Sequence, residues 1–310
     1  MFSTKTSAAG LAILCSLTLL VLKLGVGLAI GSISILSEAI DSGVDLLAAL
    51  IAYFSIRLAI QPADERHPFG HGKMENISGT VEAILIFLAA AFIVYEAVMR
   101  LVEGVVPIAV DLGLGVMLVT LVVNIFLSRH LLKVARATDS VALEADARNR
   151  VTDVYKSLGV LAGLGVVRLA GLFTADPIIY ILDPLIGIGV AVFIMKTAYE
   201  VLRRAFVDLV DVRLPEEEEA VIRAAILEHC GQLLGFHELR TRKAGSQRYI
   251  DLHIVVAQDT HVHDAHSLID HIEQDVMRKL PHSSVTVHIE PCDGSCPECP
   301  YPCPQEKREP

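Results

Sequence analysis

Acidic side chains stand inside two of the most apolar stretches of this chain, where a charge needs a partner. In the stretch 33–59, Glu38, Asp41 and Asp45 recur at i, i+3 and i+7, a spacing that places all three on one face of a helix. A second apolar stretch, 142–170, repeats this spacing with Asp146, Asn149 and Asp153. Two helices are therefore predicted to carry matching polar stripes.

Such stripes are costly in a membrane, because an aspartate at the bilayer centre costs about 2.5 to 3.5 kcal/mol on insertion scales. One interpretation is a structural network in which Lys156, Arg148 and Arg150 neutralise the acids. Against it, the two arginines lie on other faces of the helix from Asn149 and Asp153. Carboxylates with one neutral amide are also typical metal ligands. The pattern favours a divalent cation between the two helices.

The elements that hold these residues are predicted to be membrane spans. A span takes about 20 mainly apolar residues, and the chain is 53% hydrophobic with no tryptophan. A net charge of −10 excludes nucleic acid and anionic lipid surfaces as leading partners. Six stretches qualify as spans: 9–31, 33–59, 77–101, 107–132, 142–170 and 177–201.

Basic residues set the predicted orientation. They gather at 57–73, at 129–136 and at 203–204, whereas the alternate connections carry almost none. By the positive-inside rule, both termini face the cytoplasm, which makes this an integral protein of the cytoplasmic membrane. We expect a six-span domain over 1–205, a cytoplasmic domain over 206–291 and a tail over 292–310.

The polar C-terminal part is predicted to form a small α+β domain. A helix with an acidic first turn begins near 215, and two alternating runs at 235–245 and 247–258 follow as a hairpin. A run with helical periodicity over 263–280 and a strand over 283–291 complete the order αββαβ.

The loop after the second predicted span holds a possible second metal site. Asp64, His67 and His71 lie close together in the sequence, and Pro68 and Gly70 exclude a helical arrangement of the two histidines. The chain has no H-E-x-x-H motif, which argues against a metalloprotease. Binding and purely structural roles for these residues both stay open.

The tail carries cysteines with the spacing C-x₃-C-x₂-C-x₃-C, interleaved with prolines that disfavour helix and strand. Reduced thiolates in the cytoplasm can close a tetrahedral zinc site, while a disordered tail that binds soft metals weakly is the alternative. The residues concerned are Cys292, Cys296, Cys299 and Cys303.

These motifs together resemble the cation diffusion facilitator family. The resemblance rests on D-x-x-x-D in the second span, a ligand pair four residues apart in the fifth, and HPFGHGKME after the second span. It covers essentially the whole chain. It implies a homodimer with six spans and a cytoplasmic αββαβ domain that exchanges cytoplasmic divalent metal for protons by alternating access.

The resemblance also implies roles for individual residues. It places the transport site at Asp41, Asp45, Asn149 and Asp153. It places further ligands at Asp64 and His71, and it pairs Lys73 with Asp211 to link the spans to the cytoplasmic domain. Matching positions in the cytoplasmic domain, which bind metal mostly at the dimer interface, are His237, His253, His266, His288 and Glu290.

One position departs from the family pattern and bears on the metal. The zinc-transporting branch usually has histidine where this chain has Asn149. Oxygen ligands favour manganese, so we expect Mn²⁺ as the substrate, Fe²⁺ next, and Zn²⁺ or Cd²⁺ as the alternative. An amide does not titrate, so exchanged protons must be carried by Asp41, Asp45, Asp153 or the neighbouring Glu38.

A second class of function is a membrane-anchored metal sensor or scaffold. The intramembrane acids argue against it, because an anchor has no use for them. An enzyme is not predicted, since no nucleophile and base arrangement is evident in the sequence.

Overall fold

The computed structural model describes residues 2–30, 33–103, 113–171 and 182–292. Contacts divide the chain into two compact units, Met1–Phe206 and Val207–Pro310. We call them the helical unit and the C-terminal unit, and each is described by itself.

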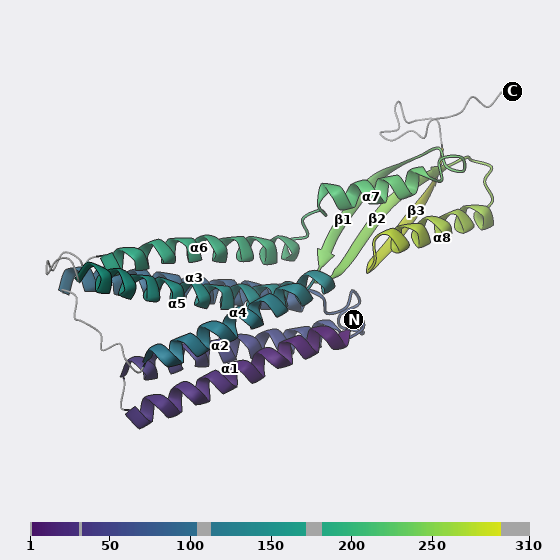
Figure 1. The fold of residues 1–310 in the computed structure, drawn as a ribbon. Helices are drawn as coiled ribbons and strands as arrows, with labels where there is room; N and C mark the ends of the chain where they lie inside the picture. Colours follow the sequence, from purple (N-terminus) through teal and green to yellow (C-terminus); the bar gives the residue numbers. More distant parts are fainter. Residues whose placement is uncertain (1, 31–32, 104–112, 172–181, 293–310) are drawn as a thin grey trace. The chain divides into compact units, whose positions relative to one another are not determined.

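Long helices form the helical unit (Figure 1). Each overlaps one predicted span, although α4 and α6 begin and end five to eight residues later than predicted, and α5 carries the second polar stripe. The helices are α1 (Phe2–Ile30), α2 (Ile33–Ala59), α3 (Lys73–Glu103), α4 (Gly113–Thr138), α5 (Val141–Gly171) and α6 (Leu182–Leu209).

Small side chains let these helices approach closely. Alanines dominate the buried cluster shared by α1, α2, α4 and α5, among them Ala12, Ala52 and Ala147. Gly79 of α3 is a point of near contact, where an added Cβ would meet Val141 at 3.0 Å and Ala205 at 3.2 Å. Close backbone approach through small residues is typical of helices that pack in lipid.

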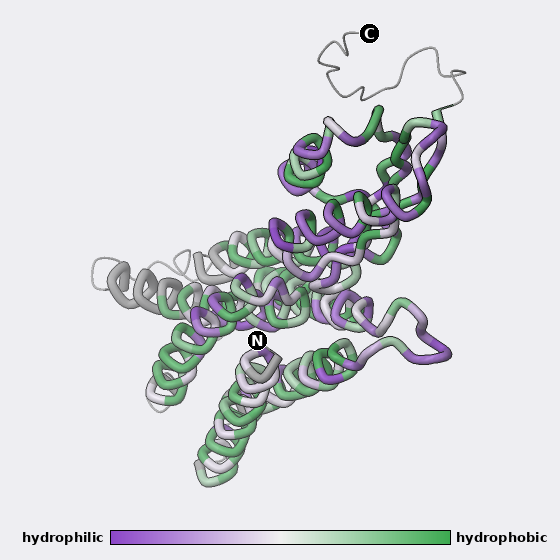
Figure 2. Tube along the Cα trace, turned by 90° about the vertical axis from the view of Figure 1, so that its right-hand side faces the viewer, coloured by the Kyte–Doolittle hydropathy of each residue, from purple (hydrophilic) through white to green (hydrophobic). Residues whose placement is uncertain are grey.

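The outer surface of the helical unit is apolar. Large hydrophobic side chains such as Leu14, Phe54, Phe92 and Phe126 are exposed, and Figure 2 shows hydrophobic residues along these helices. Among the described residues, four helices are long and apolar enough to cross a membrane: Thr4–Ala29, Glu38–Ala59, Lys73–Met99 and Gly115–Thr138.

The C-terminal unit has the predicted element order αββαβ. After α7 (Glu216–Leu227), strands β1 (Gly235–Ala244) and β2 (Gln247–Val256) form an antiparallel hairpin, which turns at Gly245 with a φ of 60°. Helix α8 (Val262–Lys279) then leads to β3 (Ser283–Pro291), which pairs parallel with β2. The sheet order is β1-β2-β3.

Alternation along the strands decides which face of this sheet is buried. Phe236 of β1 and Ile250, Leu252 and Ile254 of β2 join the apolar core with residues of α7 and α8, such as Ile272. The residues between them therefore point to the opposite face, away from the helices. Histidines of all three strands lie on that open face.

Candidate metal sites

The two predicted polar stripes face each other in the helical unit. Helices α2 and α5 pack together, and the Asn149 side chain donates a hydrogen bond to Asp45 Oδ1 at 3.0 Å. Asp41, Asp45 and Asp153 line one cavity. The structure thus brings the four residues predicted for the transport site together, although they come from positions more than a hundred residues apart.

This intramembrane cavity is small and polar. It has a volume of about 50 Å³, which is room for an ion with little water around it. Helix α4 contributes Met117, Thr120 and Asn124 to its wall, so neutral oxygens lie beside the carboxylates. A cluster rich in oxygen suits hard divalent cations, and it tolerates softer ones.

Two lysines also line the cavity: Lys156, which the sequence offered as a possible partner of the acids, and Lys23, which it did not. Lys156 Nζ lies 3.2 Å from Asp153 Oδ1, one turn along α5. Lys23 of α1 binds Glu38, with Nζ 3.0 Å from Oε2 and 3.3 Å from the backbone oxygen. The i, i+3 spacing of Asp153 and Lys156 was the available signal for the first contact. The contact between Lys23 and Glu38 joins two helices and could be seen only in the structure.

The neutralising network considered from the sequence is found only in part. Arg148 lies 3.7 Å from Glu144, and Arg150 lies 3.3 Å from Asp146, so both arginines pair with acids of α5 that do not line the cavity. Of the three basic residues considered, only Lys156 is ion-paired with a predicted ligand.

Asp146 belongs to a separate buried cluster rather than to the stripe with Asn149 and Asp153. Its partner Arg150 donates a hydrogen bond to Ser16 of α1 at 2.9 Å, and both members of the pair are fully buried. Glu82 of α3 is buried nearby, with one oxygen 3.3 Å from Ser78 Oγ. As an acid within an apolar run, Glu82 could have been noticed in the sequence.

The loop between α2 and α3 forms a compact cluster of possible ligands. His67 Nδ1 lies 3.2 Å from Asp64 Oδ1, and His71 Nε2 lies 3.5 Å from Asp64 Oδ2. One ligand atom from each residue falls within 4.8 Å of the others. Gly70, with a φ of 76°, permits the turn that brings His71 back. Two imidazoles and a carboxylate fit a tetrahedral ion with one open position.

The Asp64 carboxylate is already fixed by its own loop. Its Oδ1 accepts backbone N–H bonds from His67 at 2.6 Å and from Arg66 at 2.9 Å. The hydrogen bond from the His67 backbone is the main reason why the pKa of Asp64 lies below its ordinary value. The charged form that a metal requires is therefore favoured.

A second cluster crosses the open face of the sheet. His237, His253 and His288 lie side by side in register on β1, β2 and β3. Glu290 accepts hydrogen bonds from His237 Nε2 at 3.0 Å and from His253 Nδ1 at 2.9 Å, and His288 Nε2 lies 3.7 Å from the same carboxylate. Partial burial raises the pKa of Glu290, but the bonds from His253 and His237 outweigh it and the pKa is lowered. We call these residues the sheet cluster.

His266 does not join the sheet cluster within one chain. It lies on α8, which packs against the opposite face of the sheet, and its side chain is 73% exposed with Asp270 4.0 Å away. Its predicted part in metal binding requires a second chain and stays a prediction.

The remaining predicted residues have separate places. Asp211 lies 3.5 Å from Arg242 within the C-terminal unit, while Lys73 begins α3 in the helical unit, so their predicted pairing joins two separately described units and stays a prediction. Cys292 is half-buried, and its backbone N–H donates to Val256. The predicted tail ligands that lie outside the described residues are Cys296, Cys299 and Cys303.

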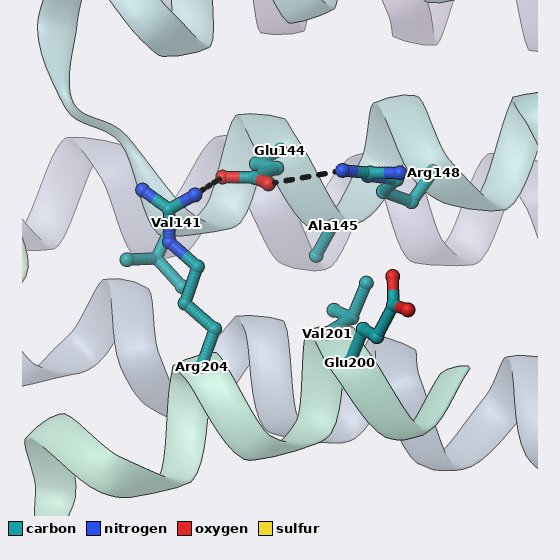
Figure 3. Close-up of a pocket in the computed structure, with 7 residues that line it drawn as sticks. All are labelled: Val141, Glu144, Ala145, Arg148, Glu200, Val201 and Arg204. Carbon is teal, nitrogen blue, oxygen red and sulfur yellow. Dashed lines mark ion pairs between the residues drawn. The ribbon is translucent and has the colours of Figure 1, made fainter. Parts of the chain in front are cut away.

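A larger cavity, of about 200 Å³, lies between α5 and α6 and is a poor metal site (Figure 3). Its Glu144 is held by both Arg148 and Arg204, and its Glu200 lies 3.9 Å from Lys196. Its carboxylates are thus already balanced by cations of the protein.

Comparisons with known proteins cover both units. The model of the cation efflux transmembrane domain matches residues 10–210, and that of the cation efflux protein cytoplasmic domain matches residues 214–292. A Synechocystis protein, "Uncharacterized transporter sll1263", is 35% identical over 88% of this chain and 86% of its own length. The cation-efflux pump FieF of Salmonella arizonae is 31% identical over 89% of each chain.

Solved structures are similar to a part of this chain. The zinc form of CzrB, titled a putative zinc transporter, is 38% identical over 28% of this chain and 99% of its own, with a TM-score of 0.27. The metal-bound C-terminal domain of the CzcD transporter from Thermotoga maritima is 29% identical over 24% of this chain and 87% of its own, with a TM-score of 0.23.

Proposed function

The chain belongs to the cation efflux family, and from this premise we propose that it exports a divalent metal cation from the cytoplasm in exchange for protons. Members of the family are transporters and not enzymes, so the chain is a membrane transporter. Its parts are a helical membrane domain and a C-terminal domain with a small sheet. Export by alternating access in a homodimer is the finer mechanism that we propose.

The cavity between α2 and α5 carries this proposal. Asp41, Asp45 and Asp153 line it, and Asn149 contacts Asp45 at 3.0 Å. Like charges gathered inside a membrane protein are expensive unless a cation compensates them, and such residues commonly mark ion pathways. We therefore assign the transported ion to these four residues.

Proton exchange follows from the chemistry of the same cavity. When the metal leaves, its carboxylates lose their counter-charge, and protons can restore it. The Asn149 amide cannot take up a proton, so the carboxylates of Asp41, Asp45 and Asp153, with Glu38 beside them, carry the exchanged protons.

Manganese is our leading substrate and iron the next. The cavity offers carboxylate, amide and hydroxyl oxygens, which suit Mn²⁺, and none of the described residues that line it is a histidine. Zinc is an equally well supported substrate, because zinc binds most sites more tightly than manganese does. Cadmium is grouped with zinc in this alternative. Transport measurements must decide between them.

We further propose six spans with both termini in the cytoplasm. Helices α5 and α6 would be the remaining two spans. Glu144, Asp146, Arg148 and Arg150 make the first half of α5 too charged to be recognised by composition, but the ion pairs described above reduce their cost. The proposed domains are 1–205, 206–291 and a Cys-rich tail over 292–310.

The loop cluster and the sheet cluster are proposed as regulatory metal sites. Both combine imidazole with carboxylate, a ligand set that binds zinc and similar ions. Bound metal would reduce the repulsion between two acidic C-terminal domains and so favour one dimer arrangement. The tail cysteines would provide a further soft-metal site.

The proposal is tested by uptake into inside-acidic proteoliposomes with Mn²⁺, Fe²⁺, Zn²⁺ and Cd²⁺ offered separately. We expect manganese flux in the parent and none in the variant with Asp45→Ala and Asp153→Ala. Glu200→Ala, which removes an exposed carboxylate of α6, is the matched control and should transport normally.

Each contrary outcome has a different meaning. Zinc flux without manganese flux would retain the exporter and refute the argument from Asn149. Flux without any dependence on the proton gradient would refute the exchange. A folded, inserted protein that moves none of the ions would contradict the proposal and favour a membrane-anchored metal sensor.

A further inference from the structure

The cavity between α2 and α5 contains cations of the protein itself. Four carboxylates line it, but Lys23 and Lys156 line it too. With all groups charged, the cavity therefore carries a net charge of −2, which one divalent cation would neutralise. The lysines thus set how much positive charge must be brought in from outside.

The two lysines are held differently. Lys23 is 4% exposed and touches two oxygens of Glu38, which fixes it between α1 and α2. Lys156 makes one hydrogen bond, to Asp153 Oδ1, and its side chain is 27% exposed. A lysine on a flexible four-carbon stem that is held by one hydrogen bond moves away more readily than one held by two. Lys23 is an anchor, whereas Lys156 is movable.

Asp153 is where the lysine and the metal meet. Its Oδ1 binds Lys156, while its Oδ2 is buried and has no hydrogen-bond partner among the described residues. A buried carboxylate oxygen without a donor is costly and indicates a missing ligand. A divalent ion at Oδ2 would lie close to the Lys156 ammonium, and like charges at that separation repel strongly.

From this geometry, and resting on the proposed function, we propose that Lys156 is a tethered counter-cation of the transport site. Its ammonium holds Asp153 while the metal is absent and leaves Asp153 when a divalent cation binds. When the metal departs, the ammonium returns and limits rebinding. Lys156 thereby lowers the affinity of the site and speeds release, acting as a positioning residue through Asp153.

The test compares two substitutions that must act in opposite directions. Lys156→Met keeps the length of the side chain and removes the charge, so divalent metal should bind on the order of tenfold more tightly. Lys156→Arg keeps the charge and can grip both oxygens of Asp153, so metal should bind roughly threefold more weakly or worse. A merely structural lysine would give losses in both variants.

Affinity is measured by calorimetric titration of Mn²⁺ into the full chain in detergent. All variants also carry Asp64→Ala, His253→Ala and serine in place of the tail cysteines. These changes remove the other proposed metal sites, so that the titration reports the cavity between α2 and α5. In proteoliposomes, Lys156→Met should lower KM and also lower kcat, because release becomes slow. Lys196→Met is the matched control, since it removes a lysine paired with a carboxylate on α6 outside the cavity and should leave both values unchanged.

The outcomes separate this inference from the proposed function. Parent binding that is lost in Asp45→Ala, together with unchanged or weaker binding in Lys156→Met, would overturn the role of Lys156 alone. A parent that neither binds metal at this cavity nor transports it would overturn both. Opposite shifts in the Met and Arg variants would support the tethered counter-cation.

Discussion

A buried ion pair joins three parts of the helical unit, and its removal should destabilise the fold strongly. Lys5 Nζ of α1 lies 2.9 Å from Glu75 Oε1 of α3, and each side chain is 3% exposed. The second oxygen of Glu75 accepts a hydrogen bond from Ser140, just before α5. Breaking one partner of a buried pair typically costs about 3 to 5 kcal/mol, because the other charge stays buried.

The structure ranks the two single substitutions. Lys5→Met leaves Glu75 with its bond from Ser140, so we expect a loss near the lower limit, about 3 kcal/mol. Glu75→Met removes the carboxylate from both Lys5 and Ser140, so we expect about 5 kcal/mol. At roughly 2 to 4 °C per kcal/mol, the Tm should fall by about 6 to 12 °C and 10 to 20 °C respectively.

The double substitution distinguishes the ion pair from general damage. Two methionines in place of the pair leave no isolated charge, so the double variant should lose less than the sum of the single losses. Thermal melting in detergent is followed by circular dichroism, because the chain has no tryptophan to report by fluorescence. Lys196→Met, in an exposed pair on α6, should change the Tm by about 2 °C at most.

Two results would refute this reasoning. One is a fall in Tm for Lys5→Met or Glu75→Met no larger than that of the exposed control. The other is a double variant whose loss equals the sum of the single losses, which would mean that the two side chains do not interact.

Three further predictions concern other parts of the molecule. Asn149→His should raise zinc flux relative to manganese by about tenfold in proteoliposomes, since imidazole suits zinc; an unchanged ratio would count against the role of the amide. The hydrogen bond from His229 lowers the pKa of Asp275. The charged Asp275 carboxylate therefore stabilises the folded state fully at pH values above the unfolded-state pKa near 3.9, and this stabilisation is lost as the pH falls through the lower pKa of the folded state. Asp275→Asn should therefore flatten the acid limb of Tm against pH, and an unchanged limb would contradict this. Glu290→Ala should remove one bound metal per chain in equilibrium dialysis, whereas Asp270→Ala should remove none; equal stoichiometries would refute the sheet cluster as a site.

Periodicity was sufficient to predict the elements and several of the acids that line the cavity between α2 and α5. The i, i+3 and i+7 spacing placed Asp41 and Asp45 on one helical face, and the fold brings that face to Asn149 and Asp153. The alternation in the runs 235–245 and 247–258 likewise predicted the hairpin that β1 and β2 form. These predictions depend on local geometry, which a sequence carries directly.

Pairings between distant helices could not be predicted in the same way. Asp146 belongs to the same i, i+3 and i+7 pattern as Asn149 and Asp153. In the structure, however, it pairs with Arg150, which also donates a hydrogen bond to Ser16 on α1. Nothing in the sequence around Lys23 predicted that it would pair with Glu38 of the next helix. Such pairings depend on which helices become neighbours, and a single sequence carries little information about that.

The neighbouring positions Asn149 and Arg150 restrict how α5 can move. Asn149 is bonded to Asp45 of α2, whereas Arg150, next in the chain and about 100° around the axis, is bonded to Ser16 of α1. Rolling α5 about its long axis would pull both side chains from their partners at once. We therefore expect the cavity to open by tilting of α5 rather than by rolling, with α5 moving together with α1, α2 and α4, the helices that share its buried cluster.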